Sequence, residues 1–160
     1  MSLDFRSILD RFTAAVEGTD GTGLGALFTE DGIYHDTFYG EFRGRAEIAG
    51  MLKERFWGDA TRFYWDMYEP VYDAVEGLGY ARWVFSYTST MEDSAGKRVA
   101  FDGMSSFRIE GGLIRHYREV FSAGIAFVQL GMSPERTAKI LQRIVDSHAA
   151  DPEWARHLSG

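Results

Sequence analysis

The chain has 160 residues, of which 45% are hydrophobic and 15% aromatic, enough apolar surface to bury one sizeable core. Its 17 Lys and Arg against 24 Asp and Glu give a net charge of −7, and no basic patch offsets it. This charge repels nucleic acid and anionic lipid, so we expect neither as a partner. The absence of cysteine excludes disulfides, thiolate nucleophiles and Cys-ligated zinc.

The start of the chain, MSLDFRSILDRF, mixes acids and arginines with its apolar residues. It therefore lacks the continuous apolar run of a signal peptide. The most apolar later stretch, 124–132, is far shorter than the about 20 residues that cross a bilayer. We expect a soluble, cytoplasmic protein, which also fits the lack of cysteine.

Apolar residues at three- and four-residue steps predict a first helix that ends at Gly18, and these are Phe5, Ile8, Leu9, Phe12 and Val16. The glycines of 21–25 follow no strand pattern, so we interpret them as a link into a short helix rather than a phosphate-binding loop. Residues 33–38 then predict a short strand and residues 40–44 a turn. A helix follows, with an apolar face made by Ile48, Met51, Leu52 and Phe56.

From Arg62 onward, aromatic and β-branched residues dominate, and turn signals fall at 76–77, 93–97 and 110–112. This pattern predicts four antiparallel strands joined by three tight turns. Helices followed by a long meander are typical of an α+β domain in which the helices cover one face of a curved sheet.

Ser133 followed by Pro134 predicts the start of another helix, because the hydroxyl can cap it and proline needs no donor in the first turn. Its apolar face consists of Ile140, Leu141, Ile144 and Val145. A second start signal at 151–153 predicts a last short helix. Since the apolar face must be buried somewhere, we expect residues 133–160 to be an ordered helical extension of the domain formed by residues 1–132.

The chain resembles the SnoaL-like branch of the nuclear transport factor 2-like (NTF2-like) superfamily in the order of its elements and in three strings: LFTEDGIYHDTFYGEFRGRAEI, FRIEGGLIRHYREVF and AFVQLGMSP. That branch includes polyketide cyclases, ketosteroid isomerases and limonene-epoxide-hydrolase-like enzymes. The resemblance covers nearly the whole chain. It implies a cone-shaped fold with a pocket for a small molecule, in which the N-terminal helices lie on the concave face of a curved antiparallel sheet. The helix expected after Ser133 is additional to that fold.

Asp36 matches the position where the resemblance to ketosteroid isomerases implies a proton-transferring carboxylate. An apolar pocket would raise its pKa and make it a better base for a weakly acidic C–H. Alternatively, Asp36 hydrogen-bonds the turn at 37–40. Phe12 and Ser105 stand where those isomerases have their oxyanion donors, and loss of one such donor typically costs about 100- to 1,000-fold in rate. We therefore do not expect steroid isomerisation.

Glu119 matches the strand where the resemblance to cyclases and epoxide hydrolases implies an acid/base residue. Alternation along the strand puts Tyr117, Glu119 and Phe121 on one face, where aromatic neighbours would desolvate the carboxyl. Alternatively, Glu119 forms an ion pair with an arginine on an exposed face. The Arg-x-Asp string of the epoxide hydrolases reads Arg82-Trp83-Val84 here, so the arginine is present and its carboxylate partner is missing.

The sequence does not decide which face of strand 79–90 lines the pocket. One side carries Trp83, Phe85 and Tyr87, and the other carries Tyr80, Arg82, Val84 and Ser86. Apolarity favours the first set as pocket wall, whereas the resemblance favours Arg82. Arg82 is otherwise a surface residue at a dimer contact. The substrate-binding residues that we expect are Tyr34, Trp65, Arg82, Phe107 and Tyr117.

His35 and His116 lie beside the two acids in sequence but on the opposite faces of their strands. We expect them to point outward or into an interface. The chain has 4 His, and no two stand at helical or hairpin ligand spacing, so we expect no metal site and no cofactor.

Two functions remain possible. The first is a cofactor-free isomerase, cyclase or hydrolase that acts on a small apolar carbonyl or epoxide ligand, with Asp36 and Glu119 as acid and base. The second is a non-catalytic ligand-binding or dimerisation domain. A pocket holding both carboxyls within about 10 Å discriminates between them. Because the helices can cover only one face of strand 79–90, we also expect a homodimer through the outer face of the meander, with His116 and Arg118 in the interface.

Overall fold

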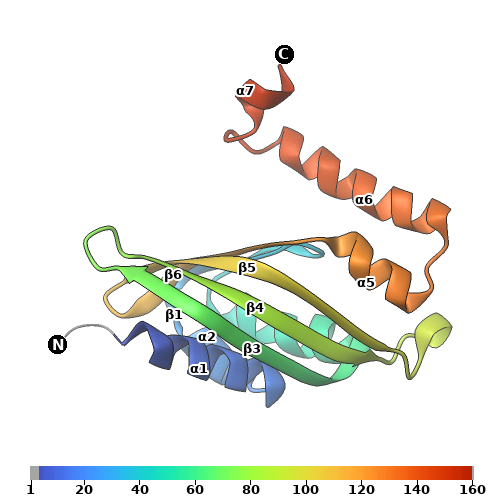
Figure 1. Ribbon diagram of the computed structural model, residues 1–160. Coiled ribbons are helices and arrows are strands. Elements are labelled where there is room, and N and C mark those ends of the chain that lie inside the picture. Colours follow the sequence, from blue (N-terminus) through green and yellow to red (C-terminus); the bar gives the residue numbers. More distant parts are fainter. Residues whose placement is uncertain (1–3, 160) are drawn as a thin grey trace.

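The computed structural model describes residues 4–159 (Figure 1). One curved sheet has the strand order β2-β1-β6-β5-β4-β3. Its strands are β1 (Phe28–Asp36), β2 (Gly40–Arg43), β3 (Ala60–Asp73), β4 (Leu78–Ser89), β5 (Arg98–Glu110) and β6 (Leu113–Phe121). Its helices are α1 (Phe5–Glu17), α2 (Gly21–Ala26), α3 (Arg45–Met51), η1 (Leu52–Phe56), α4 (Trp57–Asp59), η2 (Glu92–Ser94), α5 (Ala123–Leu130), α6 (Pro134–Ala149) and α7 (Ala155–Leu158).

The sheet confirms the predicted meander, but the strands beside it differ from those that the sequence predicts. Strands β3 to β6 pair antiparallel in sequence order. However, β1 pairs with β6 in parallel, so the curved sheet that we expected to be antiparallel is mixed at this one pairing. The predicted turn at 40–44 is largely the edge strand β2, paired with β1. The first strand begins before the predicted residue 33, because a register shift between Phe28 and Ile33 breaks the alternation that marks a strand.

The N-terminal helices cover the concave face of the sheet, as predicted (Figure 1). Helix α1 buries the expected stripe of Phe5, Ile8, Leu9, Phe12 and Val16. Asp4 begins the helix by accepting a hydrogen bond from the Ser7 N–H at 3.3 Å, and Gly18 ends it. The Phe12 ring packs on Tyr34 and Tyr117, with centroids 6.0 and 4.9 Å apart, so α1 closes the inner end of the cone.

Strand β3 bends through two irregular positions. Arg62 and Glu69 both have positive φ, and each lies inside a register shift between β3 and β4. Such bulges bend a strand and increase its twist, which helps the sheet to curl around its inner face. At Gly103 on β5, a Cβ would lie 2.5 Å from the Trp83 ring and 2.6 Å from the Val120 carbonyl oxygen, so a side chain at this position would displace the indole.

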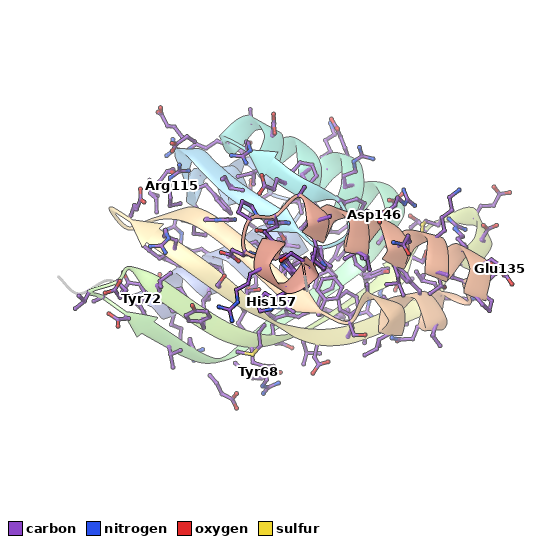
Figure 2. The ribbon with its side chains drawn as sticks, turned by 90° about the horizontal axis from the view of Figure 1, so that it is seen from above. Tyr68, Tyr72, Arg115, Glu135, Asp146 and His157 are labelled. Carbon is purple, nitrogen blue, oxygen red and sulfur yellow. The ribbon has the colours of Figure 1, made fainter. Side chains whose placement is uncertain are left out.

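Helix α5 packs against β5 at the end of the sheet, whereas α6 and α7 lie above the outer face and leave β3 and β4 uncovered (Figures 1 and 2). As predicted, Ser133 caps α6, and its side chain accepts a hydrogen bond from the Arg136 N–H at 3.2 Å. The apolar face of α6 is only half buried, since Leu141 remains 36% and Val145 55% exposed. Within residues 4–159, no helix is both long and apolar enough to cross a membrane.

Candidate active site

A cavity of about 90 Å³ lies between the concave face of the sheet and the segment η1–α4. Its wall is mostly aromatic, with three carboxyl groups. The lining residues are Asp36, Phe38, Tyr39, Phe56, Asp59, Ala60, Phe63, Trp65, Trp83, Phe85, Tyr87, Met91, Phe101, Glu119 and Phe121. This volume is small beside the about 300–1,000 Å³ of sites for drug-sized ligands, so the cavity suits a small molecule.

The parallel pairing of β1 and β6 brings the two predicted acids together. His35 is the register partner of Arg118, so the next residues, Asp36 and Glu119, come side by side on the inner face. Both carboxyls line the same cavity and are buried, with exposed fractions of 2% and 8%. Glu119 therefore does not form the exposed ion pair that was its alternative.

Asp36 serves the turn after β1 as well as the cavity. Its Oδ1 accepts hydrogen bonds from the N–H groups of Phe38 at 2.7 Å and Tyr39 at 2.9 Å. This is the turn-capping role expected of Asp in such a position. The pocket position and the turn-capping role, given as alternatives for Asp36, are therefore compatible, since the turn holds the carboxyl at the pocket wall.

A line of hydrogen bonds ends at Glu119. The Trp83 indole N–H donates to Ser105 Oγ at 2.8 Å, the Ser105 hydroxyl donates to Tyr117 at 2.9 Å, and the Tyr117 phenol donates to Glu119 Oε2 at 2.7 Å. The Thr37 N–H donates to Oε1 at 3.3 Å. All four donors fix the orientation of one carboxyl group in an otherwise apolar site.

Burial raises the pKa of Asp36 to about 6 and the pKa of Glu119 well above its usual range. The negative charge of Asp36 raises the pKa of Glu119 further, whereas the hydrogen bonds from the Tyr39 and Phe38 N–H groups partly offset the effect of burial on the pKa of Asp36. Asp36 is therefore the group that ionises first. Near neutral pH the pair retains a proton, held mainly by Glu119, and titrates as one coupled unit.

Of the five expected substrate-binding residues, Trp65 lines the cavity. Tyr34, Phe107 and Tyr117 are fully buried behind it, around Phe12.

The expectation that Arg82 faces the pocket is wrong. Its side chain lies on the outer face, 3.2 Å from Glu69 and over the Tyr68 ring. The inner face of β4 is instead occupied by Trp83, Phe85 and Tyr87, because burying three aromatic rings is more favourable than burying a guanidinium.

Sequence reasoning missed two polar groups of the cavity, Tyr39 and Asp59. The Tyr39 hydroxyl donates to Asp59 Oδ2 at 3.3 Å, and both residues line the wall. No motif marks Asp59, which lies in α4 just before β3, and only the fold carries it to Tyr39. The indole N–H of Trp65, another lining residue, is buried and has no hydrogen-bond partner among residues 4–159.

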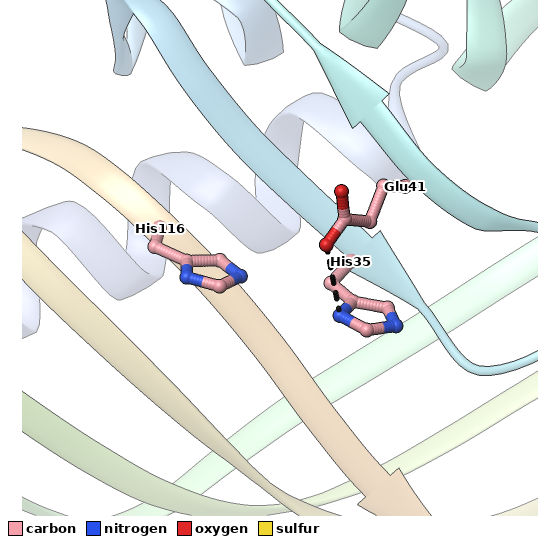
Figure 3. Close-up of side chains that lie close together, drawn as sticks. All are labelled: His35, Glu41 and His116. Atoms are coloured by element: carbon pink, nitrogen blue, oxygen red, sulfur yellow. Dashed lines mark ion pairs between the residues drawn. The ribbon is translucent and has the colours of Figure 1, made fainter. Parts of the chain in front are cut away.

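On the opposite face of the sheet, three side chains of the types that ligate metal ions lie near one another. His35, Glu41 and His116 lie close together there (Figure 3). They are outside the cavity and take no part in the carboxyl pair.

A sequence model of the SnoaL-like domain matches residues 9–117, more than half of the chain. A hypothetical protein of ketosteroid isomerase-like fold from Catenulispora acidiphila, solved with trimethylamine, is similar in structure, with a TM-score of 0.71 and 22% identity over 80% of this chain and 95% of that one. An LEH-like epoxide hydrolase of M. tuberculosis has a TM-score of 0.63 and 19% identity over 78% and 86%. A candidate polyketide cyclase of Pseudomonas putida has a TM-score of 0.62 and 17% identity over 76% and 94%.

No curated protein is significantly similar to the chain in sequence. At these identities the solved structures establish the fold alone, which is the cone-shaped NTF2-like α+β fold. The family is established by the sequence match over residues 9–117, and this chain belongs to the SnoaL-like domain family.

Proposed function

We propose that this protein is a cofactor-independent enzyme that isomerises, cyclises or hydrolyses a small apolar carbonyl or epoxide compound by acid/base catalysis. The observation that carries this proposal is the pair of buried, hydrogen-bonded carboxyls in an aromatic cavity. Two carboxyls whose environments separate their pKa values are suited to act as one base and one acid.

In this mechanism Asp36 is the base and Glu119 the acid. The Asp36 carboxylate removes a proton from the carbon next to a carbonyl, or from a water that attacks an epoxide. Glu119 donates its proton to the ligand oxygen that gains electrons. The new Glu119 carboxylate is stabilised by the Tyr117 phenol, and the proton then passes back from Asp36 to Glu119, its neighbour in the same cavity.

The ligand oxygen that gains electrons needs a hydrogen-bond donor, and the residues at the oxyanion positions of ketosteroid isomerases, Phe12 and Ser105, do not provide one. Phe12 has no donor group, and the Ser105 hydroxyl already donates to Tyr117. We assign the role to the Glu119 carboxylic acid, assisted by the unpartnered N–H of Trp65. The small cavity and these donors favour a ligand with one reactive oxygen rather than a steroid.

A second candidate is a ligand-binding domain without catalysis. It is favoured by the position of Arg82, because no arginine or lysine is among the residues that line the cavity. An epoxide hydrolase of the Arg-x-Asp type would need that cation inside.

We further propose that the chain forms a homodimer through the outer face of β3–β5. That face exposes a group of large apolar side chains, namely Tyr64, Tyr68, Tyr80, Val84 and Met104. The C-terminal helices do not cover β3 and β4 (Figure 2). Arg118 pairs with Asp151 and Glu153 of its own chain, so we do not place it in the interface as the sequence had indicated.

Proton transfer can be tested without knowledge of the natural ligand. A panel of small cyclic ketones and enones is incubated with the protein in D₂O, and deuterium at the carbon next to the carbonyl is measured by mass spectrometry. Small epoxides are tested in parallel for ring opening. We expect activity in the wild type, loss in Asp36→Asn and in Glu119→Gln, and no change in Asp66→Asn, which alters an exposed carboxyl on β3.

Compounds that bind and stabilise the protein but neither exchange nor open would favour the ligand-binding domain instead. Equal activity in wild type and Asp36→Asn would contradict the assignment of the base.

A further inference from the structure

Three side chains with metal-ligating atoms converge on the outer face of the sheet. His35 lies on β1 opposite Glu41 on β2, and His116 comes from β6 on the other side of β1. One ligand atom from each lies within 4.8 Å of the other two. Figure 3 shows the two imidazole rings side by side, with the Glu41 carboxylate above His35.

We propose that His35, Glu41 and His116 bind one Zn²⁺ ion per chain, on the face of the sheet opposite the cavity. Two imidazoles and one carboxylate are a ligand set that zinc accepts, with a fourth position left for water.

The ligand atoms are available for binding. Nε2 of His116 is buried and has no hydrogen-bond partner among the residues that the structure describes. A buried, unpartnered imidazole nitrogen costs free energy unless something binds it.

Glu41 is already oriented toward the site. Its Oε2 is paired with Arg43, and its Oε1 lies 3.7 Å from Nδ1 of His35. Zinc at about 2.0–2.1 Å from each ligand holds tetrahedral ligand atoms about 3.4 Å apart. The His35–Glu41 pair is thus almost at this spacing, and the remaining approach requires small side-chain rotations rather than movement of the strands.

Two arginines lie near the site, and carboxylates neutralise both of them. Arg118, the register partner of His35, is held by Asp151 at 3.3 Å and by Glu153 at 3.2 Å. Arg115 is held by Asp31 at 3.2 Å. Because carboxylates neutralise both guanidiniums, a divalent cation beside them does not meet two free positive charges.

The ion would connect the strands that position the catalytic candidates. His35 precedes Asp36 on β1, and His116 lies on β6, the strand of Glu119. A metal bound behind these strands ties the β1–β2 hairpin to β6 and so helps to keep the two acids adjacent. The role that we assign to the ion is structural, and it does not depend on the proposed acid/base reaction.

The test uses full-length protein without a histidine tag, treated with a chelator and titrated with ZnCl₂ by calorimetry. We expect one ion per chain and a rise in melting temperature with zinc but not with MgCl₂. His35→Gln and His116→Gln should each weaken zinc binding at least about tenfold, a change that even outer-shell substitutions often cause. His157→Gln, which alters an exposed histidine, is the matched control and should bind as the wild type does.

Co²⁺ provides a second readout, because tetrahedral coordination by the wild type should give visible absorption that is absent in His116→Gln. If a histidine variant folds poorly without metal, Glu41→Gln replaces it, since Glu41 lies at the partly exposed sheet edge. The proposal is overturned if the wild type takes up no zinc, or if a folded His35→Gln, His116→Gln double variant binds zinc as tightly as the wild type.

Discussion

Tyr117 donates a hydrogen bond of 2.7 Å to Glu119, two residues further along the same face of β6. The phenol is itself an acceptor for Ser105, so the Glu119 carboxyl is the last acceptor of a buried chain of donors. This bond favours the charged form of Glu119 and opposes the effect of burial on its pKa.

Tyr117→Phe should therefore raise the pKa of Glu119 further and lower stability. Loss of one buried hydrogen bond typically costs about 0.5–1.5 kcal/mol, and the ring itself is retained. Urea denaturation at pH 7 measures the change. Tyr72→Phe removes a hydroxyl that makes no hydrogen bond among the described residues and lies outside the proposed dimer face, so it should leave the free energy of unfolding unchanged.

The carboxyl pair should make the folded protein less stable as the pH rises. Both acids have folded-state pKa values above their usual range, so between pH 4 and pH 7 the folded state retains protons that the unfolded state has lost. Their contribution to stability is complete below the unfolded pKa of about 4 and is lost as the pH rises through the folded pKa, which is about 6 for Asp36.

Urea titrations from pH 5 to pH 8 test this sign. Each retained proton contributes a slope of about 1.4 kcal/mol per pH unit. Glu119→Gln removes one titrating group, so the free energy of unfolding of the variant should fall less steeply with pH. At pH 8 the variant should be more stable than the wild type. If the free energy of unfolding of the wild type and of the variant changed in parallel with pH, the pKa of Glu119 would not be raised in the folded state.

Substitution by Phe should lower stability by different amounts at Trp65 and Trp83, the two tryptophans of the cavity wall. Trp65 N–H has no partner within the described chain, whereas Trp83 N–H binds Ser105. Trp83→Phe should cost about 1 kcal/mol more in stability than Trp65→Phe, because it leaves a buried acceptor without its donor. Urea denaturation compares the two.

Trp65→Phe should instead weaken binding of an oxygen-containing ligand, by roughly tenfold for one hydrogen bond. Binding of a hydrocarbon of similar size should change much less. Ligand titrations with a cyclic ketone and the matching cycloalkane measure this difference. If both affinities fall equally, the N–H is not a donor to the ligand.

Charge on the outer face should dissociate the proposed dimer. Val84→Glu and Met104→Glu each place a carboxylate among exposed apolar side chains of β4 and β5. We expect sedimentation velocity to give a dimer for the wild type and monomers for both variants. Val75→Glu, at a position 92% exposed between β3 and β4, is the control and should remain a dimer. A monomeric wild type at micromolar concentration would rule out the interface.

Several elements were predictable because their signals are local. The stripe from Phe5 to Val16 repeats at helical spacing, and the same residues are buried in α1. The turns at 76–77, 93–97 and 110–112 separate β3 to β6, and Ser133 with Pro134 begins α6. In each case neighbouring residues determine the backbone conformation, so the sequence contains the information directly.

The sequence also indicated Asp36 and Glu119 as a pair, through resemblance to a family rather than through spacing. Eighty-two residues separate Thr37 from Glu119, yet their hydrogen bond helps to hold the site together. Nothing in the local pattern of either strand shows that β1 joins β6 in parallel. That pairing alone brings the two carboxyls close enough to share a proton.

By itself, the sequence indicated α1, α2, α3, α6 and α7 and the meander, though not α5, and through a resemblance it indicated the family and the two candidate acids. The tertiary structure decided which face of β4 lines the cavity, excluded Arg82 from it, and added Tyr39 and Asp59 to its wall. It also placed Glu41 opposite His35 through a strand that reads as a turn, and His116 beside both. The physical reason is that helices and turns depend on contacts along the chain, whereas strand partners, burial and pKa values depend on residues distant in sequence.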